Sequence, residues 1–179
     1  MTRVLAIDAG LSSGWAVLDF KPDSLPVELA LYQGKMGLIE TVDRICETYK
    51  TYEPDVVITE KFNLRPGNKF LADLTTVSVN GALQYAMHDK FGVEMVEQTP
   101  SQAKGLVSDK VLKRLGMWPT GSTVGAKDAD DVRDALRHAV HFGVVELKHR
   151  PTAELGWPQE KEECCGSIRG CLTCPEEDI

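Results

Sequence analysis

Apolar residues in this chain alternate between short β-type runs and longer stretches with helical spacing. Residues 4–7 form a continuous apolar run that ends in Asp8, and a second apolar run over 14–20 follows closely. A run this apolar predicts a central strand that is covered on both faces. The same pattern predicts strands over residues 3–9, 14–20, 27–36, 55–60 and 93–96.

Helical periodicity covers most of the remaining sequence. It predicts helices over residues 38–52, 69–90, 100–115 and 128–148, whereas residues 118–126 are rich in Gly, Ser and Thr and predict a loop. Three strands followed by alternating helices and strands favour an α/β fold. We expect a mixed five-stranded sheet, its first three strands antiparallel, with helices on both faces.

Length and hydropathy predict one domain. The 179 residues suffice for a sizeable core, and we expect residues 1–150 to form it. No periodic pattern follows, so residues 151–179 are expected to form an acidic, cysteine-containing tail. No apolar run reaches membrane-spanning length and no signal peptide precedes the first strand, which predicts a cytoplasmic protein without a membrane partner.

The charge is unevenly distributed. The net charge of −7 argues against a generic nucleic-acid binder, but residues 1–150 hold 18 Lys and Arg against 20 Asp and Glu, while residues 151–179 hold 2 against 7. Local basic stretches in the body could therefore follow phosphates, although each lysine could equally be ordinary solvated surface. The basic stretches are Lys61, Arg65 and Lys69, and then Lys104, Lys110, Lys113 and Arg114.

Two of the predicted strands end in an acidic residue. Asp8 and Glu60 each follow an apolar run, and ligands collect at the carboxyl edge of open α/β sheets. Adjacent strands lie about 5 Å apart, so the two carboxylates could share one ion. Gly10 and Gly14 are interpreted as a tight turn that leaves Asp8 open. The alternative is an aspartate that only caps a hairpin.

A third acidic segment begins the last long helix. Asp131 and Asp134 are three residues apart and share a helix face. Capping of the helix N-terminus accounts for Asp128 but not for Asp134, and ligation by Asp128 or Asp130 stays open. Carboxylates without thiolate or imidazole partners suit Mg²⁺ or Mn²⁺. Two such ions can support phosphodiester hydrolysis.

These motifs resemble the RuvC Holliday junction resolvases of the RNase H-like (retroviral integrase) superfamily, in particular a phage or actinobacterial-type member. The resemblance spans about residues 3–145 and rests on residues 7–16, 57–62 and 131–136. It implies an RNase H-like fold and a homodimeric, two-metal endodeoxyribonuclease that resolves four-way junctions, and possibly other branched DNA, by paired nicks in recombination, repair or phage genome processing. Its catalytic, metal-binding acids fall on Asp8, Glu60, Asp131 and Asp134, the third being a position where some members have His.

The resemblance also implies DNA and dimer contacts. Phe62 falls where the family places an aromatic residue near the junction centre; it could stack on an unpaired base or simply pack in the core. Lys104 and Lys110 fall in the family's basic zone, and the helix over 69–90 inherits the dimer contact. The predicted DNA-binding residues are Lys61, Phe62, Arg65, Lys69, Lys104 and Lys110.

Cysteines and histidines leave further alternatives. Cys46 lies on an apolar helix face and is expected in the core. Four tail cysteines could hold a structural Zn²⁺ or remain reactive thiols: Cys164, Cys165, Cys171 and Cys174. His138 follows Asp134 by four residues and could carry protons at the metal edge, but we expect an ordinary surface residue.

Two other functions compete with a nuclease. A nucleotide-binding phosphotransferase of the actin and sugar-kinase type also opens with an Asp-x-Gly hairpin, but it needs two such domains and a second phosphate loop, which this sequence lacks. A non-catalytic DNA-binding protein could retain the fold, although the full set of carboxylates argues against it.

Overall fold

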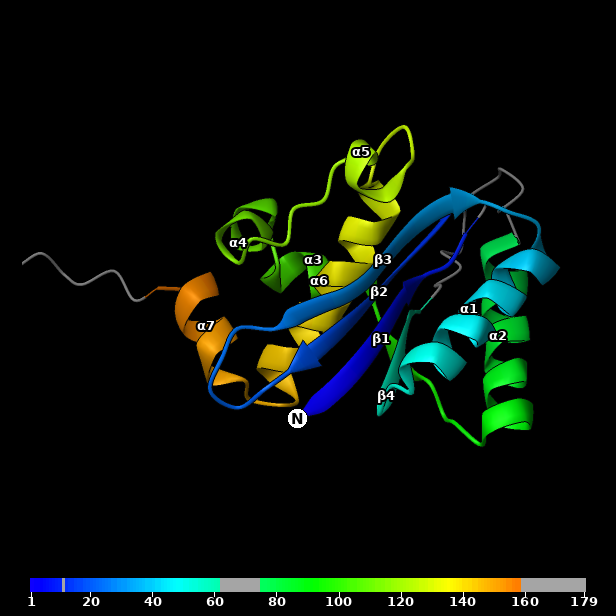
Figure 1. Cartoon of the computed structure of the whole chain (residues 1–179), viewed down its shortest axis with the longest axis horizontal. Coiled ribbons are helices and arrows are strands. Elements are labelled where there is room, and N and C mark those ends of the chain that lie inside the picture. The colour runs from blue at the N-terminus through cyan, green and yellow to red at the C-terminus, as the bar shows by residue number, and fades with distance from the viewer. Residues whose placement is uncertain (11, 62–74, 159–179) are drawn as a thin grey trace, which may run out of the picture.

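A five-stranded sheet lies between two layers of helices in the computed structural model, which describes residues 1–10, 12–61 and 75–158 (Figure 1). The strands are β1 (Thr2–Asp8), β2 (Ser12–Phe20), β3 (Val27–Lys35), β4 (Val56–Glu60) and β5 (Val96–Gln98). The helices are α1 (Leu38–Tyr52), α2 (Thr75–Phe91), α3 (Pro100–Leu106), α4 (Asp109–Arg114), α5 (Gly121–Val124), α6 (Asp130–Val145) and α7 (Arg150–Gly156).

The strand order is β3-β2-β1-β4-β5, so β1 is central as the sequence predicted. The first three strands pair antiparallel, while β4 pairs parallel with β1 and β5 pairs parallel with β4. The predicted mixed sheet with an antiparallel meander is therefore confirmed.

The continuous apolar run of β1 is explained by two separate cores. Val4 and Ala6 face the layer that contains α6, whereas Leu5 and Ile7 face α1 and α2. All four side chains are fully buried, because successive residues of a strand point to opposite faces of the sheet. Cys46 lies in the second core, as expected.

Two predicted elements differ from the structure in ways that shape the site. The helix expected over 100–115 is two helices, because the buried Val107 ends α3 and an extended Ser108 begins α4. The last strand runs over Val96–Gln98 rather than 93–96, because parallel pairing with β4 continues until Pro100 starts α3. This shift pairs Gln98 with Glu60.

The ends of the other helices also differ. The helix expected over 69–90 is described from Thr75 and ends at Phe91, and the one expected over 128–148 is α6. A capping box between Thr120 and Thr123 starts α5 inside the predicted loop.

Residues assigned to the tail begin with a helix. The side chain of Arg114 donates to the Gly156 carbonyl at 3.3 Å, and Trp157 packs against the core beneath α6. Helix α7 thus packs against the body, and the four tail cysteines lie outside the described residues. No described helix is long and apolar enough to cross a membrane.

Candidate active site

Two carboxylates leave the same edge of the sheet on neighbouring strands. Asp8 is the last residue of β1 and Glu60 is the last residue of β4. The two strands are parallel, and Ile7 pairs with Thr59. The acids therefore follow side by side, with their backbones about 5 Å apart.

A glycine in β2 allows α6 to reach this edge. Gly14 pairs with Asp8, and a Cβ atom on it would lie 2.3 Å from the backbone carbon of Asp131 and the backbone nitrogen of Val132. Only a residue without a side chain permits such an approach. Attributing Gly14 to the hairpin turn was therefore wrong, because this residue lies within β2 and makes room for the first turn of α6.

A glutamine in β3 fixes the start of α6. Gln33 pairs with Gly14, and its Oε1 accepts a 3.1 Å hydrogen bond from the backbone N–H of Val132. Its Nε2 donates to the Asp128 carboxylate at 2.7 Å. The expected capping by Asp128 is wrong: Ala129 is the N-cap residue, and the capping oxygen comes from Gln33. A single polar residue in a strand gave no sequence signal for this role.

The four predicted acids lie near enough to one another for their charges to interact. The pKa of Asp8 is raised to about 8, first by burial and then by the charges of Glu60, Asp134 and Asp131 in that order. The pKa of Asp131 is also raised. Burial is the main cause and nearby acids add to it, whereas a hydrogen bond with Ser12 lowers the pKa. The structure thus brings these acids together at a cost in free energy that a bound cation would offset.

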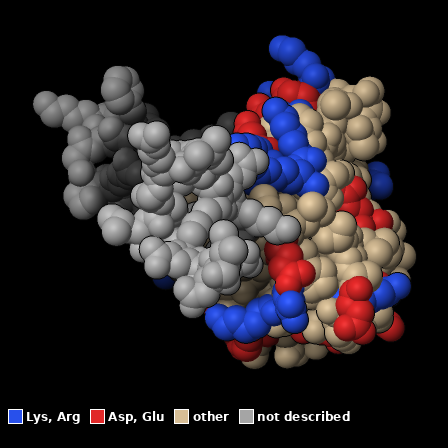
Figure 2. Space-filling view, turned by 90° about the vertical axis from the view of Figure 1, so that its left-hand side faces the viewer, with Lys and Arg blue, Asp and Glu red and all other residues tan. Residues whose placement is uncertain are grey.

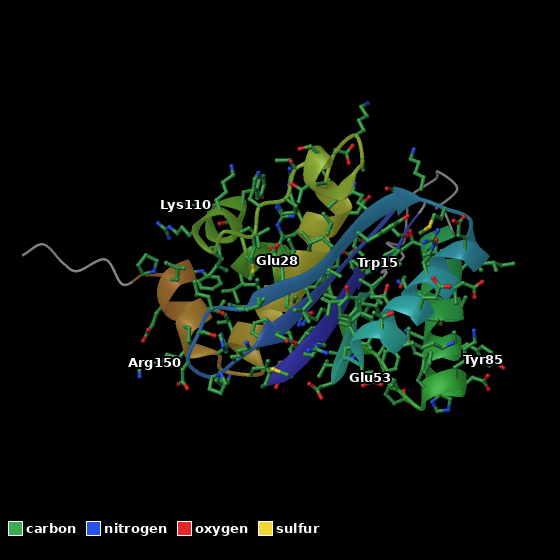
Figure 3. The ribbon with its side chains drawn as sticks, viewed as in Figure 1. Trp15, Glu28, Glu53, Tyr85, Lys110 and Arg150 are labelled. Carbon is green, nitrogen blue, oxygen red and sulfur yellow. The ribbon has the colours of Figure 1, made fainter. Side chains whose placement is uncertain are left out.

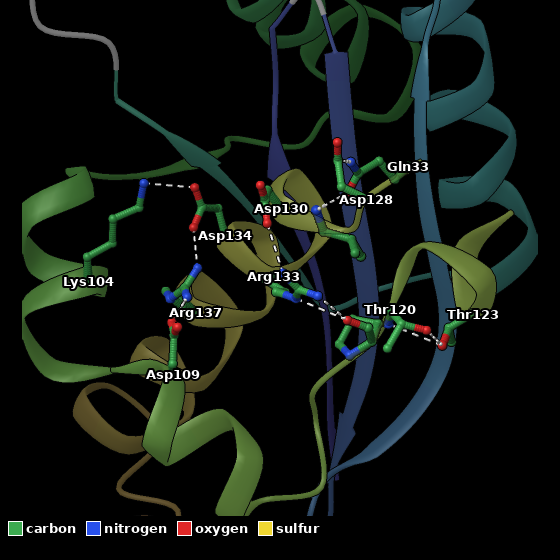
Figure 4. A network of polar contacts seen from close by, with 12 residues as sticks. Gln33, Lys104, Asp109, Thr120, Thr123, Asp128, Asp130, Arg133, Asp134 and Arg137 are labelled. Carbon is green, nitrogen blue, oxygen red and sulfur yellow. Dashed lines mark hydrogen bonds and ion pairs between the residues drawn. The ribbon is translucent and has the colours of Figure 1, made fainter. Parts of the chain in front are cut away.

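Two cations of the protein itself hold the last of these acids (Figure 4). Lys104 Nζ lies 2.8 Å from one oxygen of Asp134, and Arg137 bridges the other oxygen to Asp109. Burial lowers the pKa of Lys104, but its hydrogen bond with Asp134 and the charges of the acidic cluster outweigh burial and raise it. Lys104 therefore lies where its positive charge offsets the repulsion among the acids.

The other acids of the segment point elsewhere. Asp130 is 76% exposed in its side chain and pairs with Arg133 at 2.8 Å, while Asp128 is bound by Gln33. Neither is among the main causes of the raised pKa of Asp8.

A buried histidine contacts the acid at the end of β4. His138 is fully buried, with Nε2 3.3 Å from Glu60 Oε2 and Nδ1 3.0 Å from Gln98 Oε1. The expected surface position of His138 is therefore wrong. It faces the sheet because it lies one turn after Asp134 on the side of α6 that packs against β1 and β4.

The chemistry of the cluster fits a hard divalent cation. Its donors are carboxylate oxygens, which Mg²⁺ and Mn²⁺ prefer, and Lys104 already supplies a positive charge to three of the acids. Among the described residues, no three His, Cys, Asp or Glu side chains converge closely enough to hold an ion as they stand. Since Lys104 and Arg137 bind Asp134, the donor set is present but is not a preformed cage.

An open cleft of about 710 Å³ lies beside Asp134 between α3, α4 and α6. Its basic residues are Lys104, Lys110, Arg133 and Arg137, and Trp118 lies in its wall. Lys113 and Arg133 stack on Trp118, at 4.4 Å and 4.2 Å from the ring centre. Figure 2 shows Lys and Arg side chains gathered on the upper part of the molecular face that carries α4 and α7.

The remaining predicted DNA contacts divide into two groups. Lys61 is exposed directly after Glu60 and pairs with Glu97 at 3.3 Å. Phe62, Arg65 and Lys69 lie outside the described residues.

Comparison with known proteins shows which solved structures have a similar fold. No protein-family model and no curated protein sequence matches the chain. RuvC of Thermus thermophilus in complex with a Holliday junction substrate is similar, with a TM-score of 0.62 and 19% identity over 83% of this chain and 96% of that chain. The yeast mitochondrial Holliday junction resolvase is similar with a TM-score of 0.58 and 19% identity, over 84% of this chain and 82% of that chain. The fowlpox virus Holliday junction resolvase is similar with a TM-score of 0.53 and 11% identity, over 79% of this chain and 96% of that chain. The predicted RNase H-like fold of RuvC type is thereby confirmed.

Proposed function

We propose that this protein is a divalent-metal-dependent endonuclease that cuts branched DNA, with four-way junctions as its principal substrate. The observation that carries the proposal is geometric: Asp8 and Glu60 end neighbouring parallel strands, and α6, which holds Asp131 and Asp134, packs against this edge at Gly14. The raised pKa of Asp8, caused first by burial and then by the charges of the other three acids, agrees with this arrangement. The shared fold adds support, because the similar solved structures include RuvC in complex with a Holliday junction substrate and two other Holliday junction resolvases. DNA recombination or repair is the process that such a substrate implies.

In this proposal Asp8, Glu60, Asp131 and Asp134 hold two Mg²⁺ or Mn²⁺ ions. The ions, when bound, supply an activated water and stabilise the leaving oxygen of the phosphodiester. The chain supplies the fixed positions: two strand ends hold the first two acids, and the closely packed α6 holds the others. Lys104 is half-exposed, so it can release Asp134 and pair with a DNA phosphate instead.

DNA is proposed to lie along the cleft beside Asp134. Lys110 of α4 lines this cleft and projects from the left of the molecule in Figure 3, where it would neutralise a phosphate. Lys61, exposed directly after β4, is proposed as a second phosphate contact outside the cleft. Phe62, Arg65 and Lys69 are proposed as further DNA contacts and lie outside the described residues. Their roles rest on the sequence alone.

Paired nicks require two active sites, and we propose that a second copy docks on α1 and α2. Ile39 and Tyr85 are 73% and 70% exposed, and a shallow apolar groove of about 250 Å³ lies between these helices. Figure 3 shows Tyr85 on the outer side of α2, away from the sheet. Exposed aromatic and branched residues of this kind suit a protein contact.

The decisive experiment compares a labelled four-way junction with linear duplex and with ATP, in Mg²⁺ or Mn²⁺. Paired junction nicks by the wild type, lost in Asp8→Asn and Glu60→Gln and kept in the matched control Asp130→Asn, would support the proposal. ATP turnover would instead support a phosphotransferase. Junction binding without cleavage in either metal would support a non-catalytic DNA-binding protein.

A further inference from the structure

The buried imidazole of His138 has a partner at each nitrogen. Nε2 lies 3.3 Å from Glu60 Oε2, and Nδ1 lies 3.0 Å from the side-chain oxygen of Gln98. Gln98 is 4% exposed and pairs with Glu60 across β4 and β5. The histidine and the glutamine thus enclose the acid from α6 and from the neighbouring strand.

The chemistry of the three side chains indicates which atoms donate and which accept in these hydrogen bonds. An ionised Glu60 only accepts, so His138 donates to it through Nε2–H. A neutral imidazole then presents a lone pair at Nδ1, and the amide of Gln98 can turn its NH₂ toward that lone pair. Every polar atom of the buried ring is satisfied in this arrangement, and within the described residues the carboxylate accepts only at Oε2.

The backbone of the same acid is fixed from a third side. Asn80 of α2 donates to the Glu60 carbonyl at 2.9 Å, and its side-chain oxygen accepts from Thr59 Oγ1 at 2.7 Å. Asn80 is itself 8% exposed. With its main chain held by Asn80, the acid is left free mainly in its side-chain torsions, which the contact with His138 restricts.

We propose that His138, supported by Gln98, is a positioning residue that holds Oε2 of Glu60 and leaves Oε1 for a divalent cation. The inference rests on the proposed function, since it takes Glu60 as a metal ligand. The buried positions of α6 on either side of His138 along this face, Ala135 and Ala139, are apolar, so packing alone does not call for an imidazole here. Removing such an orienting partner typically weakens metal binding about 10- to 100-fold.

The test measures Mn²⁺ affinity of the metal-free protein by calorimetry and by electron paramagnetic resonance. His138→Leu should weaken binding about 10-fold or more, and His138→Gln, which restores an N–H near Nε2, should recover part of the loss. His141→Leu is the matched control: His141 is also buried on α6, its Nδ1 has no hydrogen-bond partner among the described residues, and its loss should leave the affinity unchanged.

Coupling to Glu60 separates positioning from general support of the fold. In a Glu60→Gln background, His138→Leu should have little further effect on Mn²⁺ affinity, because the carboxylate that it orients is gone. An equal loss in both backgrounds would overturn the proposal, and so would wild-type affinity in a folded His138→Leu protein. Should that variant fail to fold, Gln98→Leu takes its place and must show the same coupling.

Failure of the nuclease proposal gives a different result. A wild type that binds Mn²⁺ but cuts no junction would overturn the nuclease and leave the positioning role to be decided by the affinities. Junction cleavage with the same Mn²⁺ dependence in the wild type and in His138→Leu would overturn the positioning role alone.

Discussion

Replacing Asp8 by Asn should make the metal-free protein more stable at high pH. The pKa of Asp8 rises from 3.8 to about 8 on folding, so between these values the folded state binds more protons than the unfolded state. The free energy of unfolding therefore falls as the pH rises through this window. Asn carries no charge and escapes this loss. The variant and the wild type should differ little near pH 4 and most above pH 8.

The size of the effect follows from the shift. A change of about 4 pKa units at about 1.4 kcal/mol each gives an upper limit of about 6 kcal/mol. Lys104 and other cations can reorganise around the acids, so we expect about 2–4 kcal/mol. For a chain of this size that corresponds to an increase of about 5–15 °C in Tm.

The assay is thermal or urea unfolding in EDTA at several pH values from 4 to 9. Asp130→Asn is the matched control, because this exposed acid lies in the same segment but is not among the main causes of the raised pKa of Asp8. Excess Mg²⁺ should stabilise the wild type more than Asp8→Asn. An Asp8→Asn protein that is destabilised, or stabilised equally at all pH values, would refute the reasoning.

Three further predictions test the framework of the site and its assembly. Gly14→Ala should cost about 3 kcal/mol in unfolding free energy and abolish cleavage, because its Cβ would meet the backbone of α6 at 2.3 Å. Gln33→Leu should cost about 1–2 kcal/mol by leaving the Val132 N–H without its capping oxygen. Tyr85→Glu should convert a dimer into a monomer in light scattering, because it buries a charge in the proposed interface.

Each of these three has a control. Gly37→Ala should be tolerated, since a Cβ there meets no atom within 4 Å. Gln33→Glu keeps an oxygen that can accept from the Val132 N–H, but it places a negative charge beside Asp128. The cap of α6 should therefore be kept and the hydrogen bond to Asp128 lost. Wild-type stability in Gly14→Ala or Gln33→Leu, or an unchanged mass in Tyr85→Glu, would contradict the respective interpretation.

The sequence by itself determined the order of the main elements and the identity of the acids. The apolar run before Asp8 marked the central strand because a doubly covered strand needs apolar residues at every position. The acids could also be identified from local patterns. Asp8 and Glu60 interrupt apolar runs at strand ends, and Asp131 and Asp134 share a helical spacing.

Tertiary structure decided what surrounds those acids. Gln33 caps a helix almost 100 positions away, and His138 meets Glu60 only because α6 packs across the sheet. Gly14 gave the same sequence signal as a turn glycine, although its role is to admit α6. Short-range periodicity reports how a segment meets water and the core, whereas contacts between distant segments depend on register and packing that no local pattern records.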